Sequence, residues 1–260
     1  MNVVPIKIRK DDYMSPNITL FIESDYEQLS RKAAKIFADS VRTNPVGSFG
    51  FATGATPEGM YEEMVRMQGA GEADFSQITA YNLDEYFPIE ADHPQSYEYY
   101  MANKLFDAID LPHDKRNIPR GDAKDPHVEA AEYDVLAIGS RIQMQILGIG
   151  NNGHIGFNEP SDYFRGATGH VALAQSTIES NSRYFDSPDD VPRHALTMGV
   201  KTIMMAETIL MLASGEAKAP ILWDALKGLI TPLVPASILQ MHREVIVVAD
   251  NAAAKHLASV

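Results

Sequence analysis

The residues that most clearly carry chemistry lie between Gln145 and Pro160, where a glycine-rich run contains His154 and Glu159. The unperturbed pKa of histidine lies near neutrality, so an imidazole can take up and release protons at physiological pH. An apolar run stops abruptly inside this segment, which places the two residues after the end of a buried strand. We therefore expect an acid/base site that contains His154 and Glu159.

The apolar run consists of Ile146, Leu147 and Ile149, a continuous pattern typical of a strand that is covered on both faces. The glycines of the loop let the backbone adopt conformations that a Cβ would penalise, and they let main-chain N–H groups approach a small ligand. They are Gly148, Gly150, Gly153 and Gly156. The loop is therefore suited to hold a small molecule.

Two other interpretations of this loop fit less well. Its first glycines match the spacing of a dinucleotide fingerprint, but such a fingerprint opens a helix and is followed by an acidic residue about 20 positions later. The loop continues instead into Phe157-Asn158-Glu159-Pro160, without a helix-forming stretch. A metal site is disfavoured because His154 and Glu159 do not share a ligand helix and the chain has no cysteine. We therefore expect no dinucleotide and no metal.

A second candidate site is the segment Thr53-Gly54-Ala55-Thr56-Pro57, between a predicted strand and a predicted helix. Thr56 is the expected N-cap and Pro57 the first helical residue. Free N–H groups and the helix dipole attract phosphate to such an end. The segment lacks the glycine-lysine pair of a nucleotide-binding loop, so we expect a monophosphate, with a plain capped turn as the alternative.

Two adjacent acids, Asp84 and Glu85, follow the predicted strand 78–82. Successive side chains leave a strand on opposite faces, so we expect only one of the two to enter a cleft. Ligands of open α/β sheets bind at the carboxyl ends of the strands, which makes a carboxylate at this position a candidate general base. A solvated acidic turn is the alternative.

Charge and composition narrow the class of protein. The 260 residues carry a formal net charge of −13, which disfavours nucleic acid as a partner and requires local cations for any anionic ligand. Arg183 and Lys218 are candidates, with solvated surface charges as the alternative. The chain has no cysteine, no signal-peptide pattern and no apolar run long enough to span a membrane, so we expect a soluble cytoplasmic protein.

From Asn17 onwards the chain alternates strand and helix patterns, which predicts a single α/β domain with a parallel sheet and helices on its faces. We expect residues 1–16 to be a disordered N-terminal extension, Ser24 and Glu27 to form a capping box, and residues 161–169 to form a mobile lid. The predicted strands lie at residues 18–22, 48–52, 78–82, 146–149 and 245–249 and within 203–213, and the predicted helices at 24–44, 57–67, 96–105, 127–140 and 218–227 and after 249.

Several motifs together resemble the glucosamine-6-phosphate deaminase family. They are ATGATP, YNLDEYF, HPQSY, GIGNNGHIGFNEP, NSRYF and the stretch from Ser214 to Lys218. The likeness extends from about residue 17 to 250. It implies a doubly wound, mainly parallel Rossmann-like sheet in residues 17–260, and conversion of glucosamine 6-phosphate and water to fructose 6-phosphate and ammonia without a cofactor.

The resemblance also implies roles for single residues. Asp84 matches the base that removes the C2 proton, and His154 matches the acid/base that opens the sugar ring. Asn152 and Glu159 match the residues that assist this histidine. The phosphate of the sugar would be held by Thr53, Gly54, Ala55, Thr56, Arg183 and Lys218.

The chain departs from the family pattern at two places. One branch has aspartate at the position of Asn152, and a neutral amide orients an imidazole without stabilising its cation. Regulated, hexameric members have cations where this chain has Gly169 and Val171. The resemblance is thus greatest to the shorter, unregulated branch, and a monomer is expected rather than a hexamer.

Two rival functions remain open. A 6-phosphogluconolactonase would share the fold and the phosphate loop, but lactonases typically have arginine where Tyr86 stands and lack the Asn158-Glu159-Pro160 ending. A catalytically silent sugar-phosphate sensor is the other, although each expected catalytic residue type is present. The sequence also leaves open whether the substrate is the glucosamine or the galactosamine epimer.

Overall fold

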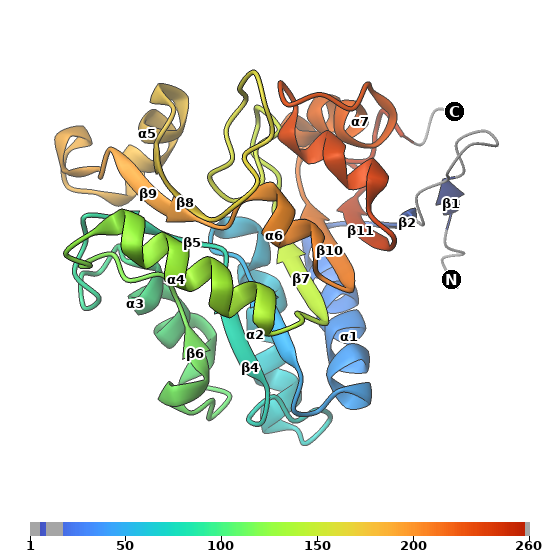
Figure 1. Cartoon of the computed structure of the whole chain (residues 1–260). Coiled ribbons are helices and arrows are strands. Elements are labelled where there is room, and N and C mark those ends of the chain that lie inside the picture. Colours follow the sequence, from blue (N-terminus) through green and yellow to red (C-terminus); the bar gives the residue numbers. More distant parts are fainter. Residues whose placement is uncertain (1–5, 9–17, 258–260) are drawn as a thin grey trace.

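The computed structural model describes residues 6–8 and 18–257 (Figure 1). The strands of its larger sheet are β1 (Ile6–Ile8), β2 (Ile18–Glu23), β3 (Ser48–Phe51), β4 (Thr79–Asn82), β6 (Arg116–Asn117), β7 (Met144–Leu147), β10 (Thr208–Ala213) and β11 (Val245–Asp250). Within the described residues these eight strands lie in the order β1-β2-β11-β10-β7-β3-β4-β6. Every neighbouring pair is parallel except β1 with β2.

The order of the strands creates a switch point between β3 and β7. From β3 the chain moves outward to β4 and β6, then returns to β7 and continues in the opposite direction to β10 and β11. The two central strands are joined through only Phe49 with Met144 and Gly50 with Gln145. In open α/β sheets ligands bind outside the carboxyl ends of the strands at such a point. The loops after β3 and β7 are therefore expected to form the binding site.

Helices cover both faces of the sheet (Figure 1). The ring of Phe37 in α1 lies 5.0 Å from that of Phe49 and 5.5 Å from that of Phe51, so α1 packs on one face of β3. The predicted single α/β domain, with a doubly wound and mainly parallel sheet, is confirmed. The helices are α1 (Tyr26–Thr43), α2 (Ala55–Gly69), α3 (Tyr97–Met101), α4 (Pro126–Gly139), α5 (Gln175–Asn181), α6 (Val200–Met204) and α7 (Ala219–Lys227).

The two predicted N-cap residues, Ser24 and Thr56, were each wrong by one or two positions. The N-cap of α1 is Asp25, whose carboxylate accepts from the Gln28 N–H at 2.9 Å, because Ser24 donates its hydroxyl to Asp25 instead. The N-cap of α2 is Gly54 rather than Thr56, and glycine has no side chain to cap the helix. Gly54 has a φ of 117°, which other residues rarely adopt, so the helix begins directly after it.

The two ends of the chain also differ from expectation. Residues 6–8 of the expected extension join the sheet as β1, whereas residues 1–5 and 9–16 lie outside the described residues. The alanine-rich segment after β11 forms hydrogen-bonded turns over residues 251–257 instead of a helix. The carboxylate of Asp250 accepts from the Ala253 N–H at 2.8 Å and also from Ser214, which tightens the chain at this point.

A second sheet of three antiparallel strands was not predicted. It consists of β5 (Asp84–Phe87), β9 (His194–Thr197) and β8 (Gly169–Ala172), in that order. The acids Asp84 and Glu85 thus begin a new strand instead of ending the strand before them. The second half of the expected lid is fixed to the fold, since the Arg165 carbonyl accepts from the Val200 N–H at 2.7 Å.

Candidate active site

The loop after β7 folds back on itself and presents His154. The Gly150 N–H donates to the carbonyl of His154 at 3.0 Å, and the Gly153 N–H donates to the carbonyl of Gly150 at 3.0 Å. The imidazole lies against Gly150, where a Cβ would come within 2.4 Å of ring atoms. Gly153 has a φ of 86°, which glycine adopts without strain. These two glycines are therefore needed for the position of the imidazole.

His154, Asn152 and Glu159 form one hydrogen-bonded group. Nδ1 of His154 lies 3.3 Å from Oε2 of Glu159, and the Asn152 amide donates to the same oxygen at 2.6 Å. The Oδ1 of Asn152 accepts from the His154 main-chain N–H at 3.2 Å. Asn152 thus contacts the Glu159 carboxylate and the His154 main chain rather than the imidazole, and its expected role in assisting His154 stays a prediction. A local sequence pattern does not reveal this, because it does not show how the loop folds.

The carboxylate of Glu159 is held at both oxygens. Oε1 accepts a hydrogen bond from the hydroxyl of Thr177, in the first turn of α5. Burial raises the pKa of Glu159, but hydrogen bonds and the charge of His154, with smaller contributions from Thr177 and Asn152, bring it below the usual value. Because a carboxylate can only accept, Nδ1 must carry the proton in this contact. Glu159 thus fixes the tautomer of His154 and leaves Nε2 available.

Asp84 lies at the start of β5 and is 5% exposed. No hydrogen-bond partner of its carboxylate is found among the described residues. Burial, and then the charge of Glu85, raise the pKa of Asp84 to about 8. A Cβ added to Gly156 would lie 3.3 Å from Oδ2 of Asp84, so the loop that carries His154 passes close to this carboxylate. Asp84 is therefore a buried acid with the properties of a proton acceptor near neutral pH.

Glu85 has a structural role. Its carboxylate accepts from the N–H groups of Tyr86, Tyr97 and Glu98 at 2.8 to 2.9 Å, and it thereby caps the start of α3. Burial raises the pKa of Glu85 to about 7 against these hydrogen bonds. The two adjacent acids therefore have different surroundings, as the alternation of a strand predicts. No local signal in the sequence shows that Glu85 caps a helix that begins 12 residues later.

The expected phosphate residues lie on three elements. The first N–H groups of α2, at Ala55 and Thr56, have no intrahelical acceptor. Nζ of Lys218, at the start of α7, donates to Asn151 at 2.6 Å, which joins the loop after β10 to the loop after β7. Burial lowers the pKa of Lys218. The loops after β3, β7 and β10 thus leave neighbouring strands at the carboxyl edge of the sheet, and the Lys218–Asn151 hydrogen bond joins the last two.

Arg183 is the candidate that the structure does not bring to the others. It lies in the short helix Ser182–Tyr184 after α5 and is exposed. Its guanidinium donates to the hydroxyl of Tyr184 at 2.8 Å and lies 4.7 Å from the centre of that ring. Within the described part of the chain it does not contact Lys218 or the segment 53–56.

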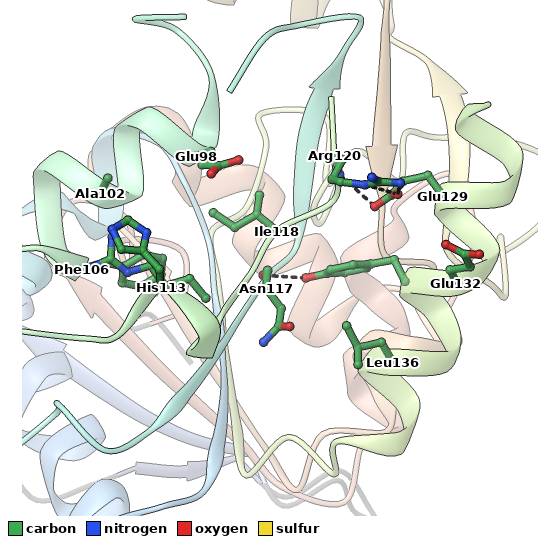
Figure 2. Close-up of a pocket in the computed structure, with 12 residues that line it drawn as sticks. Glu98, Ala102, Phe106, His113, Asn117, Ile118, Arg120, Glu129, Glu132 and Leu136 are labelled. Atoms are coloured by element: carbon green, nitrogen blue, oxygen red, sulfur yellow. Dashed lines mark hydrogen bonds and ion pairs between the residues drawn. The ribbon is translucent and has the colours of Figure 1, made fainter. Parts of the chain in front are cut away.

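One cavity lies away from these residues. It is a groove of about 720 Å³ between α4 and the segment from Glu98 to Phe106, and Figure 2 shows the ion pair of Arg120 with Glu129 at its rim. No expected site residue lines it. A smaller cavity of about 240 Å³ lies on the side of Glu159 that faces Pro232 and Pro235. Neither cavity changes the assignment of the site, which rests on the groups that can transfer protons.

The described residues contain no cluster of three or more histidine, cysteine or acidic side chains placed to hold a metal ion. Among their helices, none is both apolar enough and long enough to cross a membrane.

The fold and the site define an α/β protein with an imidazole-carboxylate pair and a buried acid at the switch point of a parallel sheet. Residues 23–248 match the family model of glucosamine-6-phosphate isomerases/6-phosphogluconolactonase. The chain therefore belongs to this family.

Known members differ in how closely they resemble the chain. A glucosamine-6-phosphate deaminase from Clostridium perfringens (strain SM101 / Type A) is 47% identical over 240 residues, which are 92% of this chain and 99% of that protein. The structure of a monomeric glucosamine-6-phosphate deaminase superimposes with a TM-score of 0.88 at 42% identity, covering 91% of this chain and 99% of the other. A 6-phosphogluconolactonase from Trypanosoma cruzi shares the fold, with a TM-score of 0.70 at 19% identity over 94% of this chain and 98% of the other.

Proposed function

We propose that this chain converts glucosamine 6-phosphate and water to fructose 6-phosphate and ammonia. The observation that carries the proposal is one loop that holds the His154–Glu159 pair and also passes close to the buried carboxylate of Asp84. The proposal is also supported by the 47% identity of this chain to a glucosamine-6-phosphate deaminase over nearly the whole of that protein. The overall reaction joins an aldose-ketose isomerisation to the loss of an amino group.

Ring opening is the first proposed step. His154 has its Nδ1 proton directed at Glu159, so Nε2 is the nitrogen that can exchange a proton with a substrate. Nε2 takes the proton of the C1 hydroxyl and returns a proton to the ring oxygen as the C1–O5 bond breaks. The product is the open-chain amino aldehyde. Glu159 stabilises the imidazolium that forms between these two transfers.

Proton transfer between C2 and C1 is the second step. The aldehyde makes the C2 proton acidic. The carboxylate of Asp84 removes this proton and returns it to C1, while O1 gains a proton and the amino nitrogen loses one, which gives a ketose imine. Water then adds to C2 of the imine, and ammonia leaves as the ketone forms. A cationic amino group at C2 would favour the ionised form of Asp84, whose pKa burial raises to about 8.

The phosphate would lie away from the reacting carbons. We propose the first turn of α2, with Thr53, Gly54, Ala55 and Thr56, together with Lys218 and Arg183, as its binding groups. Binding energy from the phosphate orients C1 and C2 toward the acid/base groups. Arg183 lies apart from the others, so in this proposal its side chain leaves Tyr184 when it binds the phosphate.

We also propose that residues 17–260 act as a monomer in the cytoplasm. The structure that superimposes at 42% identity is that of a monomeric deaminase. The chain has no cysteine, a composition typical of proteins in a reducing compartment.

The experiment that tests the function is a steady-state assay of ammonia and fructose 6-phosphate release. Glucosamine 6-phosphate and its galactosamine epimer are offered separately, and 6-phosphogluconolactone is offered as the substrate of the rival activity. We expect equal amounts of ammonia and ketose phosphate from at least one amino sugar. Lactone hydrolysis without ammonia release would favour a lactonase, and binding without turnover would favour a sensor.

A further inference from the structure

Thr177 is a buried residue, 5% exposed, in the first turn of α5. Its hydroxyl donates to Oε1 of Glu159. Among the described residues no other group donates to that oxygen, whereas Oε2 faces Asn152 and His154. The carboxylate is thus held from two separate parts of the chain, the loop after β7 and helix α5.

A hydrogen bond on each oxygen matters because a glutamate side chain does not fix the plane of its own carboxylate. The terminal torsion of glutamate is broad, and the acceptor directions lie near the carboxylate plane. With donors on both oxygens the plane is set, and Oε2 is directed at Nδ1 of His154. Without the Thr177 hydroxyl, a carboxylate that is only 13% exposed would rotate towards another donor or take up a proton.

Helix α5 also contacts the strand that carries Asp84. The Asn181 amide, near the end of α5, donates to the hydroxyl of Tyr86 at 2.8 Å. Tyr86 follows the two acids in β5, and its ring packs 5.8 Å from that of Phe157 in the loop of His154. One short helix therefore contacts both the Glu159 side and the Asp84 side of the site.

We propose that Thr177 is a positioning residue for His154: its hydroxyl fixes the plane of the Glu159 carboxylate, which in turn holds the imidazole with its proton on Nδ1. The kinetic consequences rest on the proposed function. The contact of Thr177 with Glu159 and the tautomer of His154 do not depend on that function, because both can be measured without substrate.

The kinetic test compares three variants. Thr177→Val keeps the shape and removes the hydroxyl, Thr177→Ser keeps the hydroxyl, and Ser176→Ala changes an exposed hydroxyl in the same helix. We expect Thr177→Val to lower kcat about 10- to 100-fold with little change in KM, as loss of a hydrogen bond to a charged group does. The acidic limb of its kcat profile should move to higher pH, because a hydrogen bond that lowers the pKa of Glu159 is lost. Thr177→Ser and Ser176→Ala should behave as the unchanged protein.

The substrate-free test is nitrogen NMR of the His154 ring. We expect the unchanged protein and Thr177→Ser to show the neutral imidazole protonated on Nδ1, and Thr177→Val to show a mixture of tautomers. The same tautomer in all variants would overturn the proposal, and so would an equal loss of kcat in Thr177→Val and Thr177→Ser. If Thr177→Val does not fold, a changed tautomer in folded Thr177→Ser would also overturn it. Absence of ammonia release with the expected tautomer shift would refute the proposed function alone.

Discussion

The two carboxylates of the site have opposite surroundings, although Asp84 is buried and Glu159 is half-buried. Glu159 accepts from Asn152 and Thr177 and faces His154, and its pKa lies below the usual value. Asp84 has no donor among the described residues, and burial raises its pKa to about 8. When surroundings push the pKa values of two groups apart, they assign different roles to those groups. Glu159 is suited to orient an imidazole permanently, and Asp84 to exchange a proton.

The cause of this difference lies in the elements that carry the two groups. Glu159 stands in a loop, where a side chain of the same loop and a hydroxyl from α5 reach it. Asp84 begins a strand, and the loop residue next to its carboxylate is Gly156, which has no side chain to donate. The contrast between a satisfied and an unsatisfied carboxylate is therefore built into the backbone arrangement.

The largest effect is expected from Asp84→Asn. An amide cannot remove the C2 proton, so kcat should fall by about 10²- to 10⁴-fold, the usual contribution of a positioned base. The measurement is steady-state release of fructose 6-phosphate. Binding of a non-reacting sugar-phosphate inhibitor should stay unchanged, which controls for loss of the fold. A kcat within threefold or so of the unchanged protein would remove Asp84 from the mechanism.

A smaller effect is expected from Glu159→Gln. The amide keeps the size of the side chain but lacks the charge that stabilises the imidazolium, so kcat should fall roughly 10- to 100-fold. The same assay measures it, with the pH varied. A loss larger than that of Asp84→Asn would reverse the roles that the comparison assigns to the two carboxylates.

Loss of phosphate-binding cations should affect binding rather than chemistry. Lys218→Ala and Arg183→Ala should each weaken binding of a phosphate-bearing inhibitor by about 1.5–3 kcal/mol, if each makes a charge-assisted hydrogen bond. Calorimetry measures this, with the exposed Lys35→Ala of α1 as the control. Unchanged affinity in both variants would place the phosphate elsewhere. Arg183→Ala is the more informative variant, because Arg183 contacts Tyr184 instead of the other proposed phosphate-binding residues.

Much of the fold could be predicted from the sequence because buried parallel strands leave continuous apolar runs. The strands at β2, β7 and β11 were found in this way. The antiparallel sheet was missed because β8 (GHVA) and β9 (HALT) show neither a continuous apolar run nor a strict alternation of apolar and polar residues. Their pairing partners also lie far away in the chain, which no local pattern reveals.

The types of the site residues could be predicted, but their contacts could not. His154 and Asp84 were found because each follows a predicted strand and has a side chain that transfers protons. Thr177 was not found, since it lies 18 residues after Glu159 and belongs to a different element. Arg183 was selected by a motif and lies exposed on Tyr184, so its role in phosphate binding stays a prediction.

The comparison also predicts how stability depends on pH. The pKa of Asp84 is about 8 in the folded chain, far above the value of about 3.9 in an unfolded one. Between these values the folded state binds more protons, so Asp84 lowers stability progressively as pH rises from about 4 to 8. Asparagine does not titrate. We therefore compare the stability of Asp84→Asn with that of the unchanged protein by thermal unfolding, and we expect the difference to favour the variant more at about pH 9 than at about pH 5. A stability difference that does not change with pH would contradict the raised pKa of Asp84.

The smallest effect is expected when a possible activator, N-acetylglucosamine 6-phosphate, is added to the protein. Gly169 and Val171 supply no cation for a second phosphate, and Val171 is buried. A ligand shifts an equilibrium only through different affinities for two states. We therefore expect hyperbolic kinetics and no activation by N-acetylglucosamine 6-phosphate. A sigmoidal curve that this compound makes hyperbolic would show an effector site, and Arg165, which lies beside Gly169, would be the first residue to change.

Exchange of the C2 hydrogen tests the role of Asp84 most directly. Glucosamine 6-phosphate is incubated in deuterated water with the unchanged protein, Asp84→Asn or Glu159→Gln, and deuterium is measured at C2 of recovered substrate and C1 of fructose 6-phosphate. We predict incorporation with the unchanged protein, slower incorporation with Glu159→Gln, and none above background with Asp84→Asn. Near-normal exchange in Asp84→Asn would contradict the claim that the buried, unpaired carboxylate of Asp84 carries the proton.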